Sequence, residues 1–487
     1  MNGYQLPRNA PETQGIPSAA ILKFVEEVEK NIQHLHSLMF LRHGQVVAEG
    51  WWTPYAPNVP HMLFSLTKSF TSTAMGLSLS EGRLSIDDPV ISFFPDLLPA
   101  EVSENLKGMR IRQLLCMSTG HKDDATGPAF EACPTNWVKG FLSLPVEFKP
   151  GTHFVYNSAA SHMLSAIVQK VTGQTLLDYL MPRLFESLGI DRPTWQNDPT
   201  GINTGGWGLN LKTEDIARFG QMLLQKGLWN GQRILPEAWI NEATSRQVSN
   251  GCYPESDWDQ GYGYQFWRCK HNGFRGDGAF GQYCIVMPDQ DAVLAITSGV
   301  GDMQAVMNLA WDVLQVACGP EPLAPNPLGT KKLAMKLSNL ALKAPAGAGS
   351  SSIAAQVSGK RFNFEANKLK TEAISFEFTG SGCAVWLRDA AGEHRLTCGS
   401  GDWALGETTM FSYNPLDPTP PEPTRVAACG VWTAEDMYQM TVRFYETPFC
   451  HTVKCQFTGE QVKITSSINV SFGPNEAPEL IGKQEKA

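Results

Sequence analysis

The feature that most constrains the fold is a pair of strand-rich regions that lie far apart in the sequence. Ser37–Arg42 and Gln45–Trp51 are joined at His43-Gly44, which is typical of a β-hairpin. Strand-like segments return only much later, at Gly261–Trp267, Gly281–Met287 and Ala292–Thr297. The residues between the two regions are mostly helical in pattern. We therefore expect an α+β fold in which one sheet takes strands from both regions and a helical insertion separates them.

A second domain is predicted near the C-terminus. Residues 319–352 are rich in proline, alanine, glycine and serine, which is typical of a linker. Short alternating segments follow at residues 373–378, 383–387, 438–444, 452–457 and 461–465. We expect a larger domain at residues 1–320, a linker at 321–352 and a small all-β domain, a barrel or a sandwich, at 353–487.

Composition excludes several classes of partner. The net charge of -9 argues against nucleic acid or an anionic membrane, because no long Lys/Arg run offsets it. No apolar run is long enough to span a membrane, and the N-terminus lacks the pattern of a secretion signal. The 11 scattered cysteines are expected to be reduced thiols, which favours a cytoplasmic location. Cys450 and Cys455 match no zinc pattern, so we expect neither a metal nor a cofactor.

The most chemically suggestive motif is Ser65-Leu-Thr-Lys68 at the expected start of a helix. Side chains three residues apart lie on one helix face, so the Lys68 amine would reach the Ser65 hydroxyl. Removal of the hydroxyl proton would make Ser65 a nucleophile, and the helix N-terminus would favour a developing oxyanion. Such a tetrad also arises by chance about once in a chain of this length, with the serine as a simple helix cap. Taken alone, the motif therefore leaves both interpretations open.

A second motif, Lys149–Leu164, joins a turn, an extended run and a helix, with Tyr156 at the loop tip. A nearby protonated lysine favours the anionic form of a tyrosine, so Tyr156 would accept the serine proton or pass it to a leaving group. The alternative is a half-buried tyrosine that packs the loop.

A third motif, Phe274–Tyr283, is rich in glycine and leads into an apolar strand. Glycines let a backbone approach a ligand closely, so a main-chain N–H here would complete an oxyanion hole with that of Ser65. The alternative is an ordinary Gly-rich hairpin.

Together the motifs resemble the class C β-lactamase and penicillin-binding-protein family of serine hydrolases. That family includes family VIII esterases and amide hydrolases related to 6-aminohexanoate-dimer hydrolase. The resemblance runs in order over roughly residues 10–320 and rests on Phe64–Ser69, Gly82–Pro89, Ile111–Gly120, Phe154–Ser158 and Gly208–Phe219. It implies a β-lactamase/transpeptidase-like fold and hydrolysis through an acyl-enzyme.

Carried over by position, the resemblance implies Ser65 as nucleophile, Lys68 as its activating partner and Tyr156 as general base and acid. The family commonly has an asparagine two places after this tyrosine. Here Ser158 occupies that place, and Asn157 stands one place earlier. This order resembles the amide hydrolase and esterase branches more than the β-lactamases.

The third motif departs from the family pattern. Gly276-Asp277-Gly278 stands where the lactamases place Lys-Thr-Gly or His-x-Gly, and the Ala279 N–H is the expected oxyanion donor. A cation there would hold the carboxylate of a β-lactam, whereas Asp277 would repel it unless Arg275 compensates. The residues expected to bind the oxyanion or the substrate are thus Asn157, Ser158, Asp277, Gly278 and Ala279.

We therefore expect a serine hydrolase that acts on a small ester or amide, one that is neutral or carries a cationic amine. The alternatives are a β-lactamase, a D-amino-acid peptidase, or a non-catalytic binding protein that keeps the fold. For the all-β domain, the resemblance leaves open whether it covers the cleft or mediates homo-oligomerisation.

Overall fold

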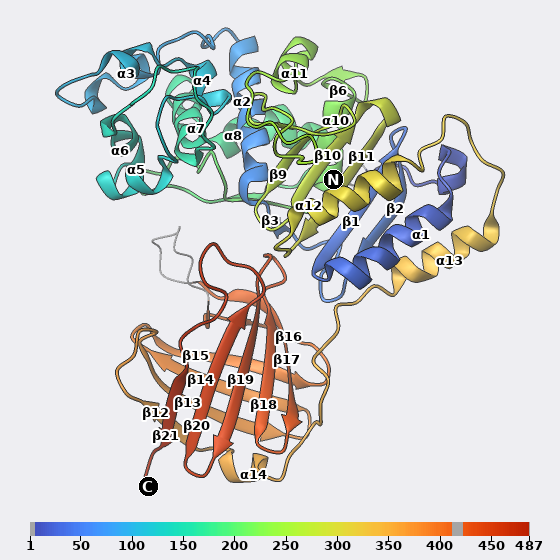
Figure 1. Cartoon of the computed structure of the whole chain (residues 1–487), viewed down its shortest axis with the longest axis vertical. Helices are drawn as coiled ribbons and strands as arrows, with labels where there is room; N and C mark the ends of the chain where they lie inside the picture. Colours follow the sequence, from blue (N-terminus) through green and yellow to red (C-terminus); the bar gives the residue numbers. More distant parts are fainter. Residues whose placement is uncertain (1–4, 412–421, 487) are drawn as a thin grey trace. The chain divides into compact units, whose positions relative to one another are not determined.

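The structure, a computed structural model, describes residues 5–411 and 422–486 and divides the chain into two compact units (Figure 1). The first unit comprises Met1–Trp51, Pro57–Ser298 and Asp302–Asn339. The second comprises Trp52–Ala56, Gly299–Gly301 and Leu340–Ala487. Each unit has a hydrophobic core of its own.

An antiparallel sheet of order β2-β1-β11-β10-β9-β8 forms the centre of the first unit (Figure 1). Its strands are β1 (Leu35–Arg42), β2 (Gln45–Trp51), β8 (Trp267–Arg268), β9 (Phe274–Gly278), β10 (Gln282–Met287) and β11 (Ala292–Ser298). The early strand β1 pairs with the late strand β11, with Phe40 opposite Leu294. The sheet therefore takes strands from both ends of the unit, as the sequence predicts.

Helices cover this sheet, since every residue of β1, β10 and β11 is buried. The helix α10 (Thr213–Leu224) packs against these three strands. Near β2, α13 (Pro327–Ser338) packs against both that strand and α1 (Ser18–Glu27).

The helical insertion between β2 and β8 begins with the short 3-10 turn η3 (Phe64–Leu66) and the helix α2 (Thr67–Ser80). Both α2 and α4 (Ile111–Leu115) pack against α7 (Ser158–Thr172), and β9 packs against η3. The other α-helices of the unit are α3 (Glu104–Gly108), α5 (Thr126–Ala132), α6 (Trp137–Ser143), α8 (Leu176–Leu180), α9 (Glu186–Leu188), α11 (Glu237–Ala243) and α12 (Met303–Leu309). Short strands β3 to β7 lie at His61–Met62, Thr194–Trp195, Leu209–Leu211, Leu228–Trp229 and Gln232–Arg233.

One part of the predicted linker is a helix. Asn326 caps α13 by accepting a hydrogen bond from the Gly329 N–H, and Pro327 occupies its first turn. Leu333 is buried, which anchors the helix to the first unit. Residues Pro327–Ser338 of the predicted linker are therefore folded as a helix.

The second unit is built almost entirely of strands. They are β12 (Arg361–Phe364), β13 (Thr371–Thr379), β14 (Gly382–Asp389), β15 (Gly392–Ser400), β16 (Ala404–Thr408), β17 (Thr424–Ala434), β18 (Met437–Arg443), β19 (Cys450–Thr458), β20 (Gln461–Ile468) and β21 (Leu480–Gln484), with the short helix α14 (Ala354–Val357) before them. All ten form one sheet, and a pairing of β15 with β17 closes the sheet on itself. Alternate residues, such as Phe376 and Val385, fill its interior.

The described residues contain neither a membrane-spanning helix nor a cluster of metal-ligating side chains. Among residues 5–411 and 422–486, no helix is both long and apolar enough to cross a membrane. The same residues contain no group of three or more His, Cys, Asp or Glu side chains placed to hold a metal ion.

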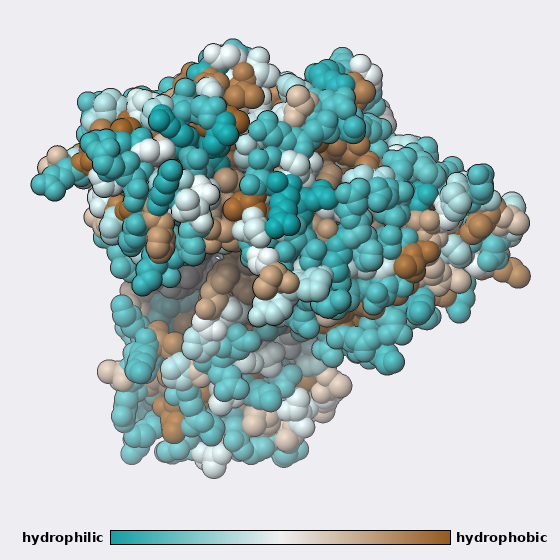
Figure 2. All heavy atoms as spheres, turned by 45° about the horizontal axis from the view of Figure 1, so that its top comes forward, coloured by the Kyte–Doolittle hydropathy of each residue, from teal (hydrophilic) through white to brown (hydrophobic). Residues whose placement is uncertain are grey.

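Figure 2 shows one face of the molecule, where hydrophilic residues predominate and hydrophobic residues gather in small groups.

Candidate active site

Ser65 lies in the turn η3, immediately before α2, and is partly exposed. The residue before it, Phe64, has a backbone φ of 47°. A bulky residue rarely adopts this left-handed conformation, and such strain is typical of functional positions. The Phe64 ring packs edge-on against Phe280, with 5.6 Å between the ring centroids.

Lys68 is only 1% exposed, and its amine faces three oxygen atoms. Nζ lies 2.9 Å from Ser65 Oγ, 2.9 Å from Ser158 Oγ and 2.9 Å from the carbonyl oxygen of Gly206. Burial lowers the pKa of Lys68 to about 7, although the charges of Asp124 and Asp277 act in the opposite direction. A large share of Lys68 is therefore neutral near pH 7.

The three oxygen neighbours determine what a neutral Lys68 amine can do. It has two N–H groups and one lone pair, and the Gly206 carbonyl can only accept a hydrogen bond. When Ser158 Oγ accepts the second N–H, the lone pair is left for the Ser65 hydroxyl. The arrangement thus allows Lys68 to remove the Ser65 proton.

Gly206 is a site residue that the sequence analysis missed. A Cβ atom at this position would lie 3.3 Å from Lys68 Nζ and 3.1 Å from Ser158 Cβ, so any side chain would crowd the amine. Thr71 Oγ1 holds the loop by donating to the carbonyl of Gly205 at 2.7 Å. The Gly-Gly pair itself was the available signal, since it permits a close approach of the backbone.

The Tyr156 side chain lies among aromatic rings. Its ring centroid is 4.8 Å from Lys68 Nζ, and its face stacks on Trp267 with centroids 5.2 Å apart and an interplanar angle of 22°. Tyr262 meets it edge-on at 6.1 Å. Burial raises the pKa of the Tyr156 phenol far above its usual value, and the negative charge of Asp277 adds to this, although a side-chain hydrogen bond with Ser65 acts against it. The phenol is therefore protonated at neutral pH.

The structure separates the two residues that follow Tyr156. The Asn157 side chain caps α7 by accepting a hydrogen bond from the Ala160 N–H at 3.2 Å, and it is fully buried. Ser158, in contrast, reaches Lys68. Of the two alternatives, Ser158 thus occupies the position next to the amine.

The strand β9 lies against the Ser65 turn through its glycines. A Cβ atom on Gly276 would be 2.4 Å from Ser69 Oγ and 2.5 Å from Leu66 Cδ1. On Gly278 it would be 1.9 Å from the Leu63 carbonyl oxygen. At Gly278, where the neighbour is a backbone oxygen, only glycine fits, and the close approach brings the end of β9, where Ala279 follows, beside the turn that holds Ser65.

The other face of β9 carries a buried ion pair. Arg275 Nε donates to Asp277 Oδ2 at 2.8 Å, and the two residues are 0% and 6% exposed. Burial raises the pKa of Asp277, while the guanidinium and a side-chain hydrogen bond from Trp267 act in the opposite direction. Arg275 therefore compensates the charge of Asp277. Whether it would do so was the question that the sequence analysis left open.

Comparisons with known proteins identify the family of this chain. The family model described as Beta-lactamase matches residues 8–316. The chain belongs to the beta-lactamase family. The resemblance expected from the motifs is thereby confirmed, and so is the assignment of the chain as a serine hydrolase.

Two similar proteins illustrate the degree of similarity. The chain is 28% identical over 295 residues to 6-aminohexanoate-dimer hydrolase of Paenarthrobacter ureafaciens, which covers 55% of this chain and 73% of the relative. It is 26% identical over 330 residues to penicillin-binding protein 4 of Amycolatopsis lactamdurans, covering 59% of this chain and 81% of the relative.

A solved structure supports the fold. A Bacillus anthracis protein provisionally named 6-aminohexanoate-dimer hydrolase superposes with a TM-score of 0.54 at 20% identity. The superposition covers 66% of this chain and 89% of that protein. The β-lactamase/transpeptidase-like fold of the first unit is therefore confirmed.

Asp124 is a second acidic residue whose charge influences the site. It is exposed and influences both Lys68 and Tyr156 electrostatically. Its carboxylate accepts hydrogen bonds from the Thr126 N–H and hydroxyl at 3.0 and 2.6 Å. Sequence analysis missed Asp124, because nothing in its local pattern distinguishes it from a solvated loop residue.

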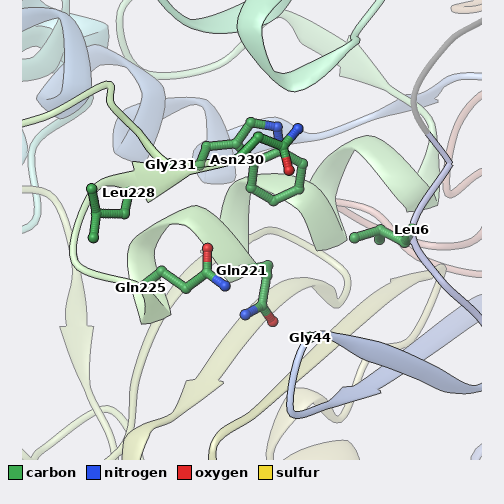
Figure 3. A pocket seen from close by; sticks show the side chains of 8 residues that line it. Leu6, Gly44, Gln221, Gln225, Leu228, Asn230 and Gly231 are labelled. Carbon is green, nitrogen blue, oxygen red and sulfur yellow. The ribbon is translucent and has the colours of Figure 1, made fainter.

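The first unit also contains a cavity, whose lining side chains are drawn in Figure 3. It has a volume of about 540 Å³ and is lined by Leu6, Gly44, Gln221, Gln225, Leu228, Trp229, Asn230 and Gly231. The lining contains no charged side chain and none of the residues around Ser65. We therefore do not connect this cavity with the hydrolase chemistry.

Proposed function

We propose that this member of the beta-lactamase family is an esterase or amidase that forms an acyl-enzyme on Ser65. The observation that carries the proposal is the buried Lys68 amine, 2.9 Å from Ser65 Oγ and with a pKa lowered to about 7. A base with a pKa near the operating pH is the most efficient acceptor of a proton.

The proposed reaction has two steps. Ser65 Oγ attacks the substrate carbonyl as its proton passes to Lys68, and the oxyanion is held by the N–H groups of Ser65 and Ala279. Tyr156, which is protonated, gives its proton to the leaving alcohol or amine and is reprotonated from Lys68. Water then attacks the acyl-enzyme by the same route in reverse and frees Ser65.

The first experiment tests the nucleophile. Ser65→Ala should abolish the turnover of p-nitrophenyl esters and labelling by a fluorophosphonate probe. Ser80→Ala, at the far end of the same helix α2, is the matched control and should behave as the native protein does. Labelling of the Ser65→Ala variant at the native rate would overturn the proposal and favour a different nucleophile.

The charges around the site support a neutral or cationic substrate. Asp277 lies on the strand beside the site, Asp124 influences Lys68 and Tyr156 electrostatically, and the guanidinium of Arg275 is fully buried and bound to Asp277. A carboxylate on the substrate would be repelled by these acids, because close like charges are unfavourable, and the Arg275 guanidinium is already paired with Asp277.

A matched pair of substrates tests this preference. We expect p-nitrophenyl butyrate to be hydrolysed at least about tenfold faster than the p-nitrophenyl monoester of succinate, which carries a carboxylate. Hydrolysis of nitrocefin at a rate rivalling that of the neutral ester would instead favour a β-lactamase. A native protein that reacts with none of these substrates and no fluorophosphonate would favour a non-catalytic binding protein.

A further inference from the structure

Trp267 joins Tyr156 to the ion pair on β9. One face of its indole stacks on the Tyr156 ring at 5.2 Å and 22°. The Trp267 ring centroid also lies 5.6 Å from the guanidinium carbon of Arg275, and a side-chain hydrogen bond between Trp267 and Asp277 acts to lower the pKa of that carboxyl. The orientation of the phenol is therefore tied to the position of the Asp277 carboxylate, although the two side chains come from distant parts of the sequence.

The carboxylate is itself held in place. Arg275 Nε binds Asp277, while Arg275 Nη1 donates to the Asp257 carbonyl oxygen at 2.9 Å. The guanidinium also lies 4.5 Å from the centroid of the Trp258 ring. Because Arg275 is fully buried and held from several sides, Asp277 has little freedom to move.

We propose that Asp277, held by Arg275, is a positioning residue that fixes the ring of Tyr156 through the indole of Trp267. This inference rests on the proposed role of Tyr156 as the proton donor to the leaving group. A general acid is effective only within hydrogen-bond reach of the group that it protonates, so a loose Tyr156 ring would slow the reaction.

The negative charge of Asp277 has a second effect, on the protonation of Lys68, which does not depend on the shape of the side chain. The charged groups that act on Lys68 are Asp124 and Asp277, and both favour the protonated amine. Tyr156 adds no charge, because its phenol is protonated. Loss of the Asp277 charge should therefore make Lys68 lose its proton at a lower pH.

Three variants separate these effects. Asp277→Asn keeps the size of the side chain and can still accept the indole hydrogen bond, but removes the charge. Asp277→Glu keeps the charge and displaces the carboxylate. Trp267→Phe keeps an aromatic face against Tyr156 and removes the N–H donor, while leaving the ion pair of Arg275 and Asp277 intact.

In Trp267→Phe we expect kcat to fall about tenfold or more, with KM changed less than about twofold and the pH dependence of kcat/KM unchanged. In Asp277→Asn we expect the acid limb of the kcat/KM profile to move to lower pH, because the neutral amine persists there. Asp277→Glu should keep the native acid limb but show a lower kcat. A merely structural carboxylate would change stability and leave kcat native in Trp267→Phe and in a folded Asp277→Glu protein.

Native kcat in Trp267→Phe would overturn the proposal, as would native kcat in a folded Asp277→Glu protein. If Asp277→Glu fails to fold, Trp267→Phe decides alone, since it leaves the ion pair in place. Ser65→Ala, assayed in parallel, distinguishes a failure of the proposed function from a failure of the positioning role. Activity in that variant would overturn the proposed function, whereas an inactive Ser65→Ala with native Trp267→Phe would overturn only the positioning role.

Discussion

Lys68 and Tyr156 both lie beside Ser65, but in unlike surroundings. Lys68 faces the oxygens of Ser65, Ser158 and Gly206, whereas Tyr156 lies against the ring of Trp267. Burial is the largest cause of the pKa shift in both groups, and it lowers the pKa of the amine while raising that of the phenol. Since burial disfavours charge of either sign, the same desolvation makes one group an available base and keeps the proton on the other.

The largest expected effect concerns the base. Lys68→Arg should reduce the rate of acylation by roughly a thousandfold. A guanidinium stays protonated at neutral pH, so it keeps the positive charge but cannot accept the Ser65 proton. Lys68→Met should be similarly impaired. The measurement is single-turnover acylation by a p-nitrophenyl ester. If the arginine variant kept most of the native rate, the positive charge of Lys68, rather than its lone pair, would be the important property.

An intermediate effect concerns the acid. Tyr156→Phe keeps the stack on Trp267 and removes the phenol, so hydrolysis of an anilide should fall by about a hundredfold. A p-nitrophenyl ester, whose leaving group needs no proton, should lose much less. The comparison of kcat/KM for the two substrates checks this difference. Equal losses on both would show that Tyr156 acts before the leaving group departs.

The smallest effect is the pH dependence of the native enzyme. Lys68 accepts a proton only when it is neutral, so kcat/KM should rise with pH and reach half of its plateau near the Lys68 pKa of about 7. One pH unit lower, the rate should be about tenfold below the plateau. Tyr156→Phe should leave this midpoint unchanged, because the phenol is protonated throughout. A profile that is flat from acid to neutral pH would contradict the neutral-amine role.

Local spacing explains which parts of the site could be predicted. Ser65 and Lys68 are three residues apart at a helix start, so their contact follows from helix geometry alone. Arg275 and Asp277 are two apart on a strand and therefore share a face, which made their pairing foreseeable. The sheet built from both ends of the first unit was also predictable, because most of its strands are recognisable from strand-like residues in their own local sequence.

Contacts between distant segments explain what was missed. Gly206 reaches Lys68 across 138 residues of sequence, and its carbonyl is a backbone atom that no side-chain pattern reveals. Trp267 lies next to Tyr156 only because β8 pairs with β9 at the edge of the sheet. The helix α13 was overlooked because the surrounding prolines and alanines outweighed its capping residue, Asn326.

The glycine at position 276 also limits how this enzyme could evolve. A lysine or arginine at this position would place a cation on β9, beside the turn that holds Ser65. A longer side chain at Gly276 would, however, enter the space of Ser69 and Leu66, which are both completely buried. A larger residue at position 276 therefore requires Ser69 and Leu66 to move or to be replaced as well, so this part of β9 cannot acquire a new side chain independently of the turn that holds Ser65.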